Sequence, residues 1–224
     1  MILAERSDME PTALTPRAQA KRDAILAAAR ELFIRQGFGS TSMDTIAVAA
    51  TVSKQTLYRY YQHKEALFIA TMQQMVFEQS TTTMFIELRQ TPIESLPQLE
   101  QALLTWASVM LEHILQPDYL ALVRVLIAEL PRFPSLGSLF FSVLPQEGGS
   151  LVKALLERAL AQGVIAAVDL EAALQLFVGS LLMPMIGALV RFDTSLQPPA
   201  PQNVATLVHL LLHGVARHPQ RETG

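Results

Sequence analysis

Residues 41–68 read TSMDTIAVAATVSKQTLYRYYQHKEALF, and this stretch contains two short helical patterns separated by a turn at Thr51. The first pattern has apolar side chains at i, i+3, i+4 and i+7, which form one face of a helix: Met43, Ile46, Ala47 and Ala50. Thr41 and Asp44 fit a capping box at its start, and Ser53 can cap the second helix. Two short helices joined by a tight turn predict a helix-turn-helix.

The second helical pattern carries polar side chains suited to contact with DNA. The recognition helix of a helix-turn-helix lies in the major groove and presents its N-terminal residues to base edges. Lys54 and Gln55 lie in its first turn and can hydrogen bond to bases, whereas Leu57 and Tyr61 face inward. We expect phosphate contacts from Ser53, Thr56, Tyr58, Arg59 and Lys64. A solvated polar face on an ordinary short helix is the alternative explanation of the pattern.

The residues on either side extend this unit. Thr15 and Pro16 predict the start of the first helix, and Gly37 predicts its end. Between them lies an apolar stripe at helical spacing: Ile25, Ala28, Ala29, Leu32 and Phe33. A fourth helix is expected from Lys64 to about Thr82. We therefore predict a flexible N-terminal arm over residues 1–14, a DNA-binding domain over 15–68 and a second domain over 69–224.

The charge is unevenly distributed between these parts. The chain has 224 residues and a formal net charge of −3. Residues 15–68 contain eight basic and four acidic side chains, whereas residues 69–224 contain eight basic and 13 acidic ones. A basic segment joined to an acidic remainder is typical of a chain in which one part meets a polyanion. A hydrophobic fraction of 50% excludes intrinsic disorder, and the lack of cysteine excludes disulfides, thiolate metal sites and cysteine nucleophiles.

The C-terminal two-thirds also reads as helical, because strand alternation and hairpin turns are missing from the pattern. The expected helices are 94–115, 118–130, 136–143, 150–162, 169–192 and 202–217. The fold class is therefore all-α. The apolar run Leu176–Val190 has 15 residues, fewer than the roughly 20 that a membrane span needs, so a core or subunit interface explains it better. Because Met1–Leu14 also lacks the features of a signal peptide, we expect a cytoplasmic protein.

Four motifs in the first 68 residues resemble the DNA-binding domain of the tetracycline-repressor (TetR/AcrR) family: Ile46-Ala47, Val52-Ser53, Thr56-Leu57-Tyr58 and Lys64-Glu65-Ala66-Leu67. Residues 127–134 are similar to the AefR-like ligand-binding domain of some members. The resemblance implies an all-helical, dimeric repressor that a ligand releases from DNA. It also implies phosphate contacts by Thr41, Tyr58 and Lys64 and base contacts by Lys54 and Gln55. The full set of expected DNA contacts is Thr41, Ser53, Lys54, Gln55, Thr56, Tyr58, Arg59, Tyr60 and Lys64.

Three positions depart from the family pattern. Thr51 replaces the usual glycine of the turn, and a β-branched residue resists a positive φ, so we expect a strained or altered turn. Tyr61 replaces phenylalanine and must place its hydroxyl near solvent or a partner. His63 replaces the usual serine or aspartate cap of the fourth helix.

Large apolar side chains in the second domain suit a pocket for an apolar or aromatic ligand. Trp106, Met110 and His113 share one helix face and form its expected wall, with Phe133 and Phe177 as further candidates. His209 and His213 have the spacing at which two imidazoles can share a zinc ion. No third ligand is evident near them in the sequence, so we expect no metal and no cofactor.

The sequence therefore favours a homodimeric regulator that binds a pseudo-palindromic operator, pairs through its last two long helices and releases DNA on binding a small molecule. An all-helical enzyme is a second possibility, but a nucleophile–base pair, a phosphate loop and a metal cluster are missing from the motifs. A constitutive DNA-binding protein is a third, and the large second domain argues against it.

Overall fold

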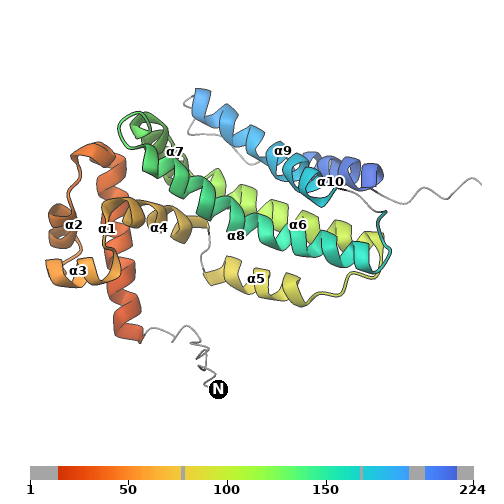
Figure 1. Ribbon diagram of the computed structural model, residues 1–224, viewed down its shortest axis with the longest axis horizontal. Coiled ribbons are helices and arrows are strands. Elements are labelled where there is room, and N and C mark those ends of the chain that lie inside the picture. Colours follow the sequence, from red (N-terminus) through yellow and green to blue (C-terminus); the bar gives the residue numbers. More distant parts are fainter. Residues whose placement is uncertain (1–14, 77–78, 167–168, 192–199, 216–224) are drawn as a thin grey trace, which may run out of the picture.

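The computed structural model describes residues 15–76, 79–166, 169–191 and 200–215, and these residues form ten α-helices. Figure 1 shows a small unit of α1–α3 at one end, here called the head, and a larger bundle of α5–α10, here called the body. Helix α4 joins the two. The predicted all-α fold is confirmed. The helices are α1 Pro16–Ser40, α2 Met43–Ala49, α3 Lys54–Tyr60, α4 Lys64–Val76, α5 Gln79–Gln90, α6 Leu96–Ile114, α7 Pro117–Glu129, α8 Pro134–Ala161, α9 Leu170–Arg191 and α10 Pro201–Val215.

The head is built on an aromatic cluster. The ring centroid of Phe33 lies 5.7 Å from that of Phe38 and 5.0 Å from that of Phe68, and all three rings are buried. Gly37 allows this packing, because its φ of 79° breaks α1 and turns Phe38 back toward the cluster. The stacked contact of Phe33 with Phe38 and its edge-to-face contact with Phe68 add to the apolar burial. The cluster therefore fixes α1 against the start of α4.

The turn between α2 and α3 keeps the geometry that glycine usually provides. Thr51 has a φ of +55°, and its amide donates to the carbonyl of Val48 at 3.1 Å. The next amide, that of Val52, donates to Ala47 at 3.0 Å. These two bonds form a Schellman motif with Thr51 at the left-handed position. The turn thus has the ordinary shape, and Thr51 bears the strain of a left-handed conformation.

Two sequence predictions about helix ends were wrong. Ser42, not Thr41, caps α2, and its hydroxyl accepts a hydrogen bond from the Thr45 amide at 3.0 Å. The predicted fourth helix is described from Lys64 to Val76 as α4 and from Gln79 as α5, and the junction between them at residues 77–78 lies outside the described residues. The helices predicted at 136–143 and 150–162 are one continuous α8, so Pro145 does not end it. A proline removes one helical hydrogen bond, which a packed helix tolerates with a bend.

Packing in the body covers one face of each of its last two helices. Val204, Val208 and Leu212 of α10 are buried, and α10 packs against α6 and α9. The opposite faces are apolar but open, with large exposed side chains on α9 and α10: Leu176, Met183, Ile186, Val190 and Leu210. Helix α9 is long and apolar enough to cross a membrane by length and composition alone, with a mean hydropathy of 2.0. Exposed apolar faces of this kind are typical of protein–protein contact sites.

Candidate nucleic-acid interface

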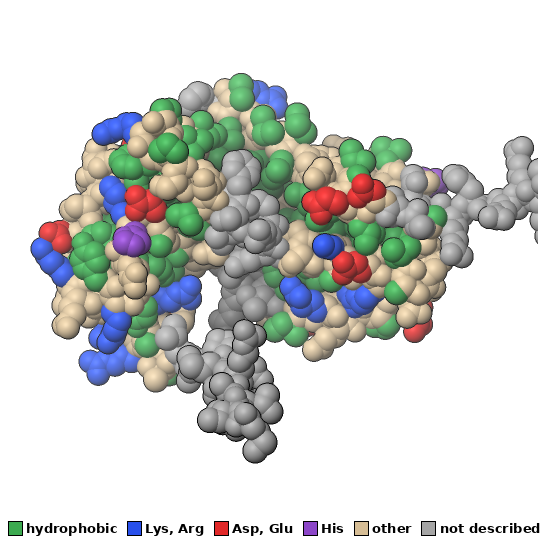
Figure 2. Space-filling view, in the orientation of Figure 1, with side chains coloured by type: hydrophobic (Ala, Val, Ile, Leu, Met, Phe, Trp, Pro, Cys, Tyr) green, Lys and Arg blue, Asp and Glu red, His purple; other side chains and the backbone are tan. Residues whose placement is uncertain are grey.

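The start of α3 is rigidly capped and its polar face is open. The Ser53 hydroxyl accepts a hydrogen bond from the Thr56 amide at 3.1 Å and lies 2.8 Å from the Thr56 hydroxyl. Leu57 and Tyr61 are buried, as predicted, and fasten the helix to the head. Figure 2 shows Lys and Arg side chains projecting from the head, in a view that shares the orientation of Figure 1. The exposed side chains of α3 are Lys54, Gln55, Tyr58 and Arg59.

An ion pair that sequence reasoning missed holds the first residue of α3. The Lys54 ammonium lies 2.6 Å from a carboxylate oxygen of Asp44, in the first turn of α2. Both side chains are more than half exposed, so the pair contributes little to folding. The ion pair mainly affects position, because it directs the Lys54 side chain toward α2. The side-chain amide of the neighbouring Gln55 is exposed beside it.

Thr41 does not fit the predicted phosphate contact through its side chain. It is only 1% exposed, and its hydroxyl donates to the carbonyls of Gly37 at 2.7 Å and Leu32 at 3.3 Å. The hydroxyl thereby links the segment after α1 to carbonyls on either side of the last regular turn before Gly37. This position beside a broken helix end is the reason that a polar residue is buried here.

Lys64 and Tyr60 also bond within the head. The Lys64 ammonium donates to the carbonyls of Phe38 at 2.7 Å and Thr41 at 2.8 Å, and it lies 4.3 Å from the Phe38 ring centroid. Burial lowers the pKa of this ammonium. The Tyr60 hydroxyl donates to Ala18 of α1 at 3.1 Å. Both side chains thus join elements of the head to each other, and the surface that faces outward is formed by Ser53, Lys54, Gln55, Thr56, Tyr58 and Arg59.

The substituted Tyr61 finds a partner, as its sequence position required. Its hydroxyl accepts a hydrogen bond from Nε of Arg22 at 3.3 Å. Burial raises the pKa of the Tyr61 phenol, and the bond from Arg22 opposes that rise. The extra oxygen relative to phenylalanine therefore adds a link between α1 and the end of α3.

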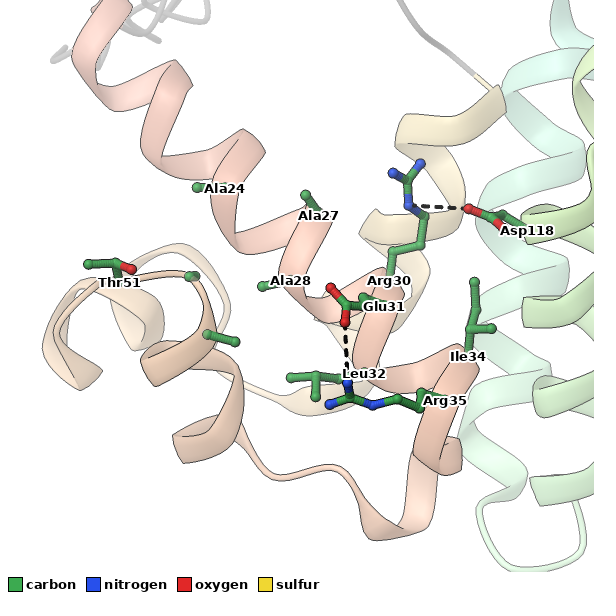
Figure 3. A pocket seen from close by; sticks show the side chains of 12 residues that line it. Ala24, Ala27, Ala28, Arg30, Glu31, Leu32, Ile34, Arg35, Thr51 and Asp118 are labelled. Atoms are coloured by element: carbon green, nitrogen blue, oxygen red, sulfur yellow. Dashed lines mark hydrogen bonds and ion pairs between the residues drawn. The ribbon is translucent and has the colours of Figure 1, made fainter.

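Two polar contacts connect the head directly to α7 of the body. Nε of Arg30 lies 3.7 Å from a carboxylate oxygen of Asp118, and the Gly39 amide donates to the Glu129 carboxylate at 3.0 Å. An open groove of about 720 Å³ runs beside the first contact, between α1, the turn at Thr51 and the start of α7 (Figure 3). The sequence did not predict these two contacts, because contacts between distant segments leave no periodic signal.

Most of the predicted pocket residues lie together on α6. Trp106, Met110 and His113 are buried on one face, and the Trp106 ring centroid lies 5.7 Å from that of Phe177 in α9. Nδ1 of His113 lies 2.7 Å from the Val109 carbonyl. The buried Nε1 of Trp106 has no hydrogen-bond partner within the described part of the chain.

Phe133 does not belong to this group, contrary to the prediction. Its ring centroid lies 5.0 Å from that of Phe38, so it packs at the junction between head and body. Its place directly before Pro134, at the start of α8, points it toward the head rather than toward α6. The expected pocket wall therefore reduces to Trp106, Met110, His113 and Phe177.

Two family models match the chain. Residues 25–71 match bacterial regulatory proteins of the tetR family, and residues 101–212 match the C-terminal domain of AefR-like transcriptional repressors. The HTH-type transcriptional regulator RutR of Escherichia coli K12 is 46% identical over 57 residues, which are 25% of this chain and 27% of RutR. The match to this curated relative thus spans about a quarter of its length.

Solved structures resemble the chain over most of its length. A TetR-family regulator from Mesorhizobium loti superimposes with a TM-score of 0.69 at 24% identity, covering 91% of this chain and 100% of that one. The flavonoid-responsive regulator FrrA is 31% identical with a TM-score of 0.64, covering 90% of this chain and 100% of its own. The structure from Mesorhizobium loti, at 24% identity, shows a likeness of fold alone, whereas FrrA, at 31% identity, is also similar in sequence.

Proposed function

Because the chain belongs to the tetR family, whose members are DNA-binding transcription regulators, we propose that it is a cytoplasmic repressor released from its operator by a small effector. The observation that carries this proposal is the exposed polar face of α3 on a rigid head. Gln55 and Lys54 read base edges in the major groove. Ser53, Thr56, Tyr58 and Arg59 bind the flanking phosphates.

A second copy of the chain covers the open apolar faces of α9 and α10. Leu176 and Val190 of α9 are 71% and 74% exposed, and Leu210 of α10 is 63% exposed. A twofold axis through these faces buries the same patch on both copies and sets the two heads side by side. Two heads one helical turn apart then meet a pseudo-palindromic operator.

The effector binds beside Trp106. The orphaned indole N–H is a buried donor, and a buried donor without a partner costs about 1–3 kcal/mol. An apolar or aromatic molecule with an oxygen acceptor relieves that cost while its ring packs near Phe177. The similarity to FrrA, a flavonoid-responsive regulator, supports an oxygenated aromatic molecule as the class.

Effector binding reaches the head by two routes. Helix α4 starts at Lys64, which holds the corner between α1 and α2, and packs against α6 and α8 of the body. Helix α7 contacts α1 through Asp118 and Glu129. An effector that favours a different arrangement of α4 and α7 changes the separation of the heads, and only such a difference between states shifts binding.

The test is a titration of oxygenated aromatic compounds against the protein bound to its operator duplex. Trp106 is the only tryptophan, so its emission reports on the proposed pocket. Release of DNA is expected at the concentrations that change this emission. Trp106→Phe keeps an aromatic ring but removes the pyrrole part of the indole with its donor, so it should raise the effector concentration for release at least about fivefold, the worth of roughly 1 kcal/mol.

Two results would contradict the proposal. Equal affinity for the operator and a random duplex would show that α3 does not recognise base sequence. Release by several compounds with unchanged Trp106 emission would place the effector elsewhere. The control is His63→Gln, an exposed position in the loop between α3 and α4 that belongs to neither the proposed base-reading face nor the proposed pocket, and it should leave emission and release unchanged.

A further inference from the structure

A carboxylate of the body lies against the corner where α1 ends. Glu129, the last residue of α7, has a side chain that is only 15% exposed, and its Oε1 accepts a hydrogen bond from the Gly39 amide at 3.0 Å. Gly39 lies two residues after the break at Gly37. Because a hydrogen bond to a carboxylate is stronger than one between neutral groups, this contact fastens the head firmly to α7.

The lack of a side chain at Gly39 allows the carboxylate to approach the backbone. A Cβ atom at this position would lie 3.1 Å from Oε1 of Glu129 and 3.3 Å from Nη1 of Arg132. Both distances are tighter than ordinary van der Waals contact. The φ of Gly39 lies outside the left-handed region, so close approach favours glycine here and backbone conformation does not.

Two cations lie near the same carboxylate. Nη1 of Arg132, from the connection between α7 and α8, lies 3.9 Å from Oε2 of Glu129. Burial lowers the pKa of the Lys64 ammonium, and the negative charges of Glu65 and Glu129 oppose that shift. Oε2 is buried without a hydrogen-bond partner in the described part of the chain. Among the described residues, the Gly39 amide is therefore the group that hydrogen bonds to this carboxylate.

Helix α4 is tied to the head near both of its ends. The Lys64 ammonium donates to two carbonyls where α1 ends, and the side-chain amide of Gln74 donates to a carboxylate oxygen of Asp23 in α1 at 3.1 Å. Helix α1 also packs against α7 of the body (Figure 1). A change in the angle between head and body must therefore alter the contact between α1 and α7, where Glu129 lies.

We propose that Glu129 is a positioning residue for operator binding, which holds the head at a fixed angle on the body through the Gly39 amide. The inference rests on the proposed function, because the angle matters for binding only if two heads must fit one operator. A head without this contact samples more orientations, and fixing one of them on DNA costs free energy. Glu129 thus acts through the orientation of α3 rather than by touching DNA.

The first measurement is the distance between head and body within one chain. The chain contains no cysteine, so introduced cysteines are unique labelling sites. Val48→Cys labels the head at a side chain that is 80% exposed, and Lys153→Cys labels an exposed position on α8. Double electron–electron resonance between nitroxide labels gives the distribution of distances. Labelled chains are diluted with unlabelled parent protein, so that distances within one chain dominate.

The variants separate the hydrogen bond from the rest of the side chain. Glu129→Ala removes the acceptor, whereas Glu129→Gln keeps an acceptor oxygen for the Gly39 amide. Gly39→Ala leaves Glu129 in place and puts a methyl group against its carboxylate. Alanine favours a helix more than glycine does, so a weakened α1 cannot explain a loss in this variant. The matched controls are Glu112→Ala and Glu112→Gln, at an exposed carboxylate on α6.

We expect Glu129→Ala and Gly39→Ala to broaden the distribution of distances. Both should weaken binding to a duplex that the parent protein selects from a random-sequence pool by at least about fivefold, the equivalent of roughly 1 kcal/mol. Glu129→Gln and the two Glu112 variants should keep the distribution and the affinity of the parent. Gly39→Ala should add little to Glu129→Ala, because the two substitutions act on the same contact. Thermal unfolding shows that each variant is folded.

Three results would overturn the positioning role of Glu129. The first is an unbroadened distribution in folded Glu129→Ala and Gly39→Ala proteins. The second is a broadened distribution with unchanged affinity for the selected duplex. The third is a Glu129→Gln protein that behaves like Glu129→Ala, because the bond to Gly39 would then not be what fixes the head.

The same experiment separates this inference from the proposed function. If the parent protein selects a sequence and every variant binds it equally well, only the role of Glu129 fails. If the parent protein selects no sequence from the pool, the proposed function fails, and the role of Glu129 in operator binding fails with it.

Discussion

Replacing Thr51 with glycine should stabilise the protein, although it removes a side chain. Thr51 occupies the left-handed position of the Schellman motif that ends α2, with φ +55°. Its side chain is exposed, and the motif depends on backbone bonds that glycine makes equally well. The substitution therefore changes the conformational energy of one residue and leaves the contacts of the core intact.

The size of the gain is the difference between two opposing effects. Left-handed backbone costs an L-residue about 1–2 kcal/mol, and glycine avoids that cost. Glycine also gives the unfolded chain more freedom, which costs about 0.4–1 kcal/mol on folding. The free energy of unfolding should therefore rise by about 0–1.6 kcal/mol, with a midpoint near 0.8 kcal/mol. For a chain of this length, 1 kcal/mol corresponds to a rise in Tm of roughly 2–4 °C.

The measurement is urea and thermal unfolding at one fixed protein concentration, because dimerisation makes apparent stability concentration-dependent. The matched control is Ala49→Gly, an exposed helical position two residues earlier, where glycine should lower stability by about 1 kcal/mol. A Thr51→Gly protein that is less stable than the parent would refute the strain assigned to Thr51. Operator affinity should stay unchanged, because Thr51 contacts no base in the proposed complex.

Four further outcomes are expected. Gln55→Ala should cost roughly 1–3 kcal/mol on the preferred operator and little on random duplex, and equal losses on both in a gel-shift titration would remove Gln55 from the reading surface. Lys64→Met should lower the free energy of unfolding by about 1–3 kcal/mol while the salt slope of DNA binding stays the same; a slope reduced by about one would instead make Lys64 a phosphate contact. Leu210→Glu should give helical monomers that lose operator binding, and a dimer in sedimentation would refute the proposed interface. Burial raises the pKa of Tyr119, so above about pH 10 the unfolded chain binds fewer protons than the folded chain, and the free energy of unfolding falls as pH rises. Tyr119→Phe should reduce this dependence on pH in urea titrations. An unaltered dependence would exclude Tyr119 as its cause.

The helix-turn-helix was predictable because its signals are local. Apolar spacing in α2, the Ser53 cap and the inward Leu57 all act within a few residues of each other, and the structure confirms them. The same holds for the start of α1, where the Thr15 side chain accepts a hydrogen bond from the Ala18 amide at 3.3 Å. Periodicity and capping describe such contacts well.

The sequence alone did not show that three of the expected DNA contacts have hydrogen-bond partners within the head that are distant in sequence. Thr41 bonds to the Gly37 carbonyl, Lys64 bonds to the Phe38 carbonyl, and Tyr60 reaches Ala18 at the other end of α1. Each residue type also suits a phosphate, so its chemistry alone did not distinguish an interior bond from a DNA contact. The position of each side chain in the folded head distinguishes an interior hydrogen bond from a DNA contact, and that position depends on the tertiary arrangement.

The ion pair between Asp44 and Lys54 bears on how the protein finds its operator. On random DNA, a cation already paired with a carboxylate releases fewer counterions, so the protein binds weakly and moves on sooner. In the proposed complex with the operator, we expect a base edge to replace Asp44 as the partner of Lys54. Weak binding to random DNA combined with tight binding to the operator shortens the search. Replacing Asp44 by asparagine should therefore lengthen the distance that the protein slides along random duplex.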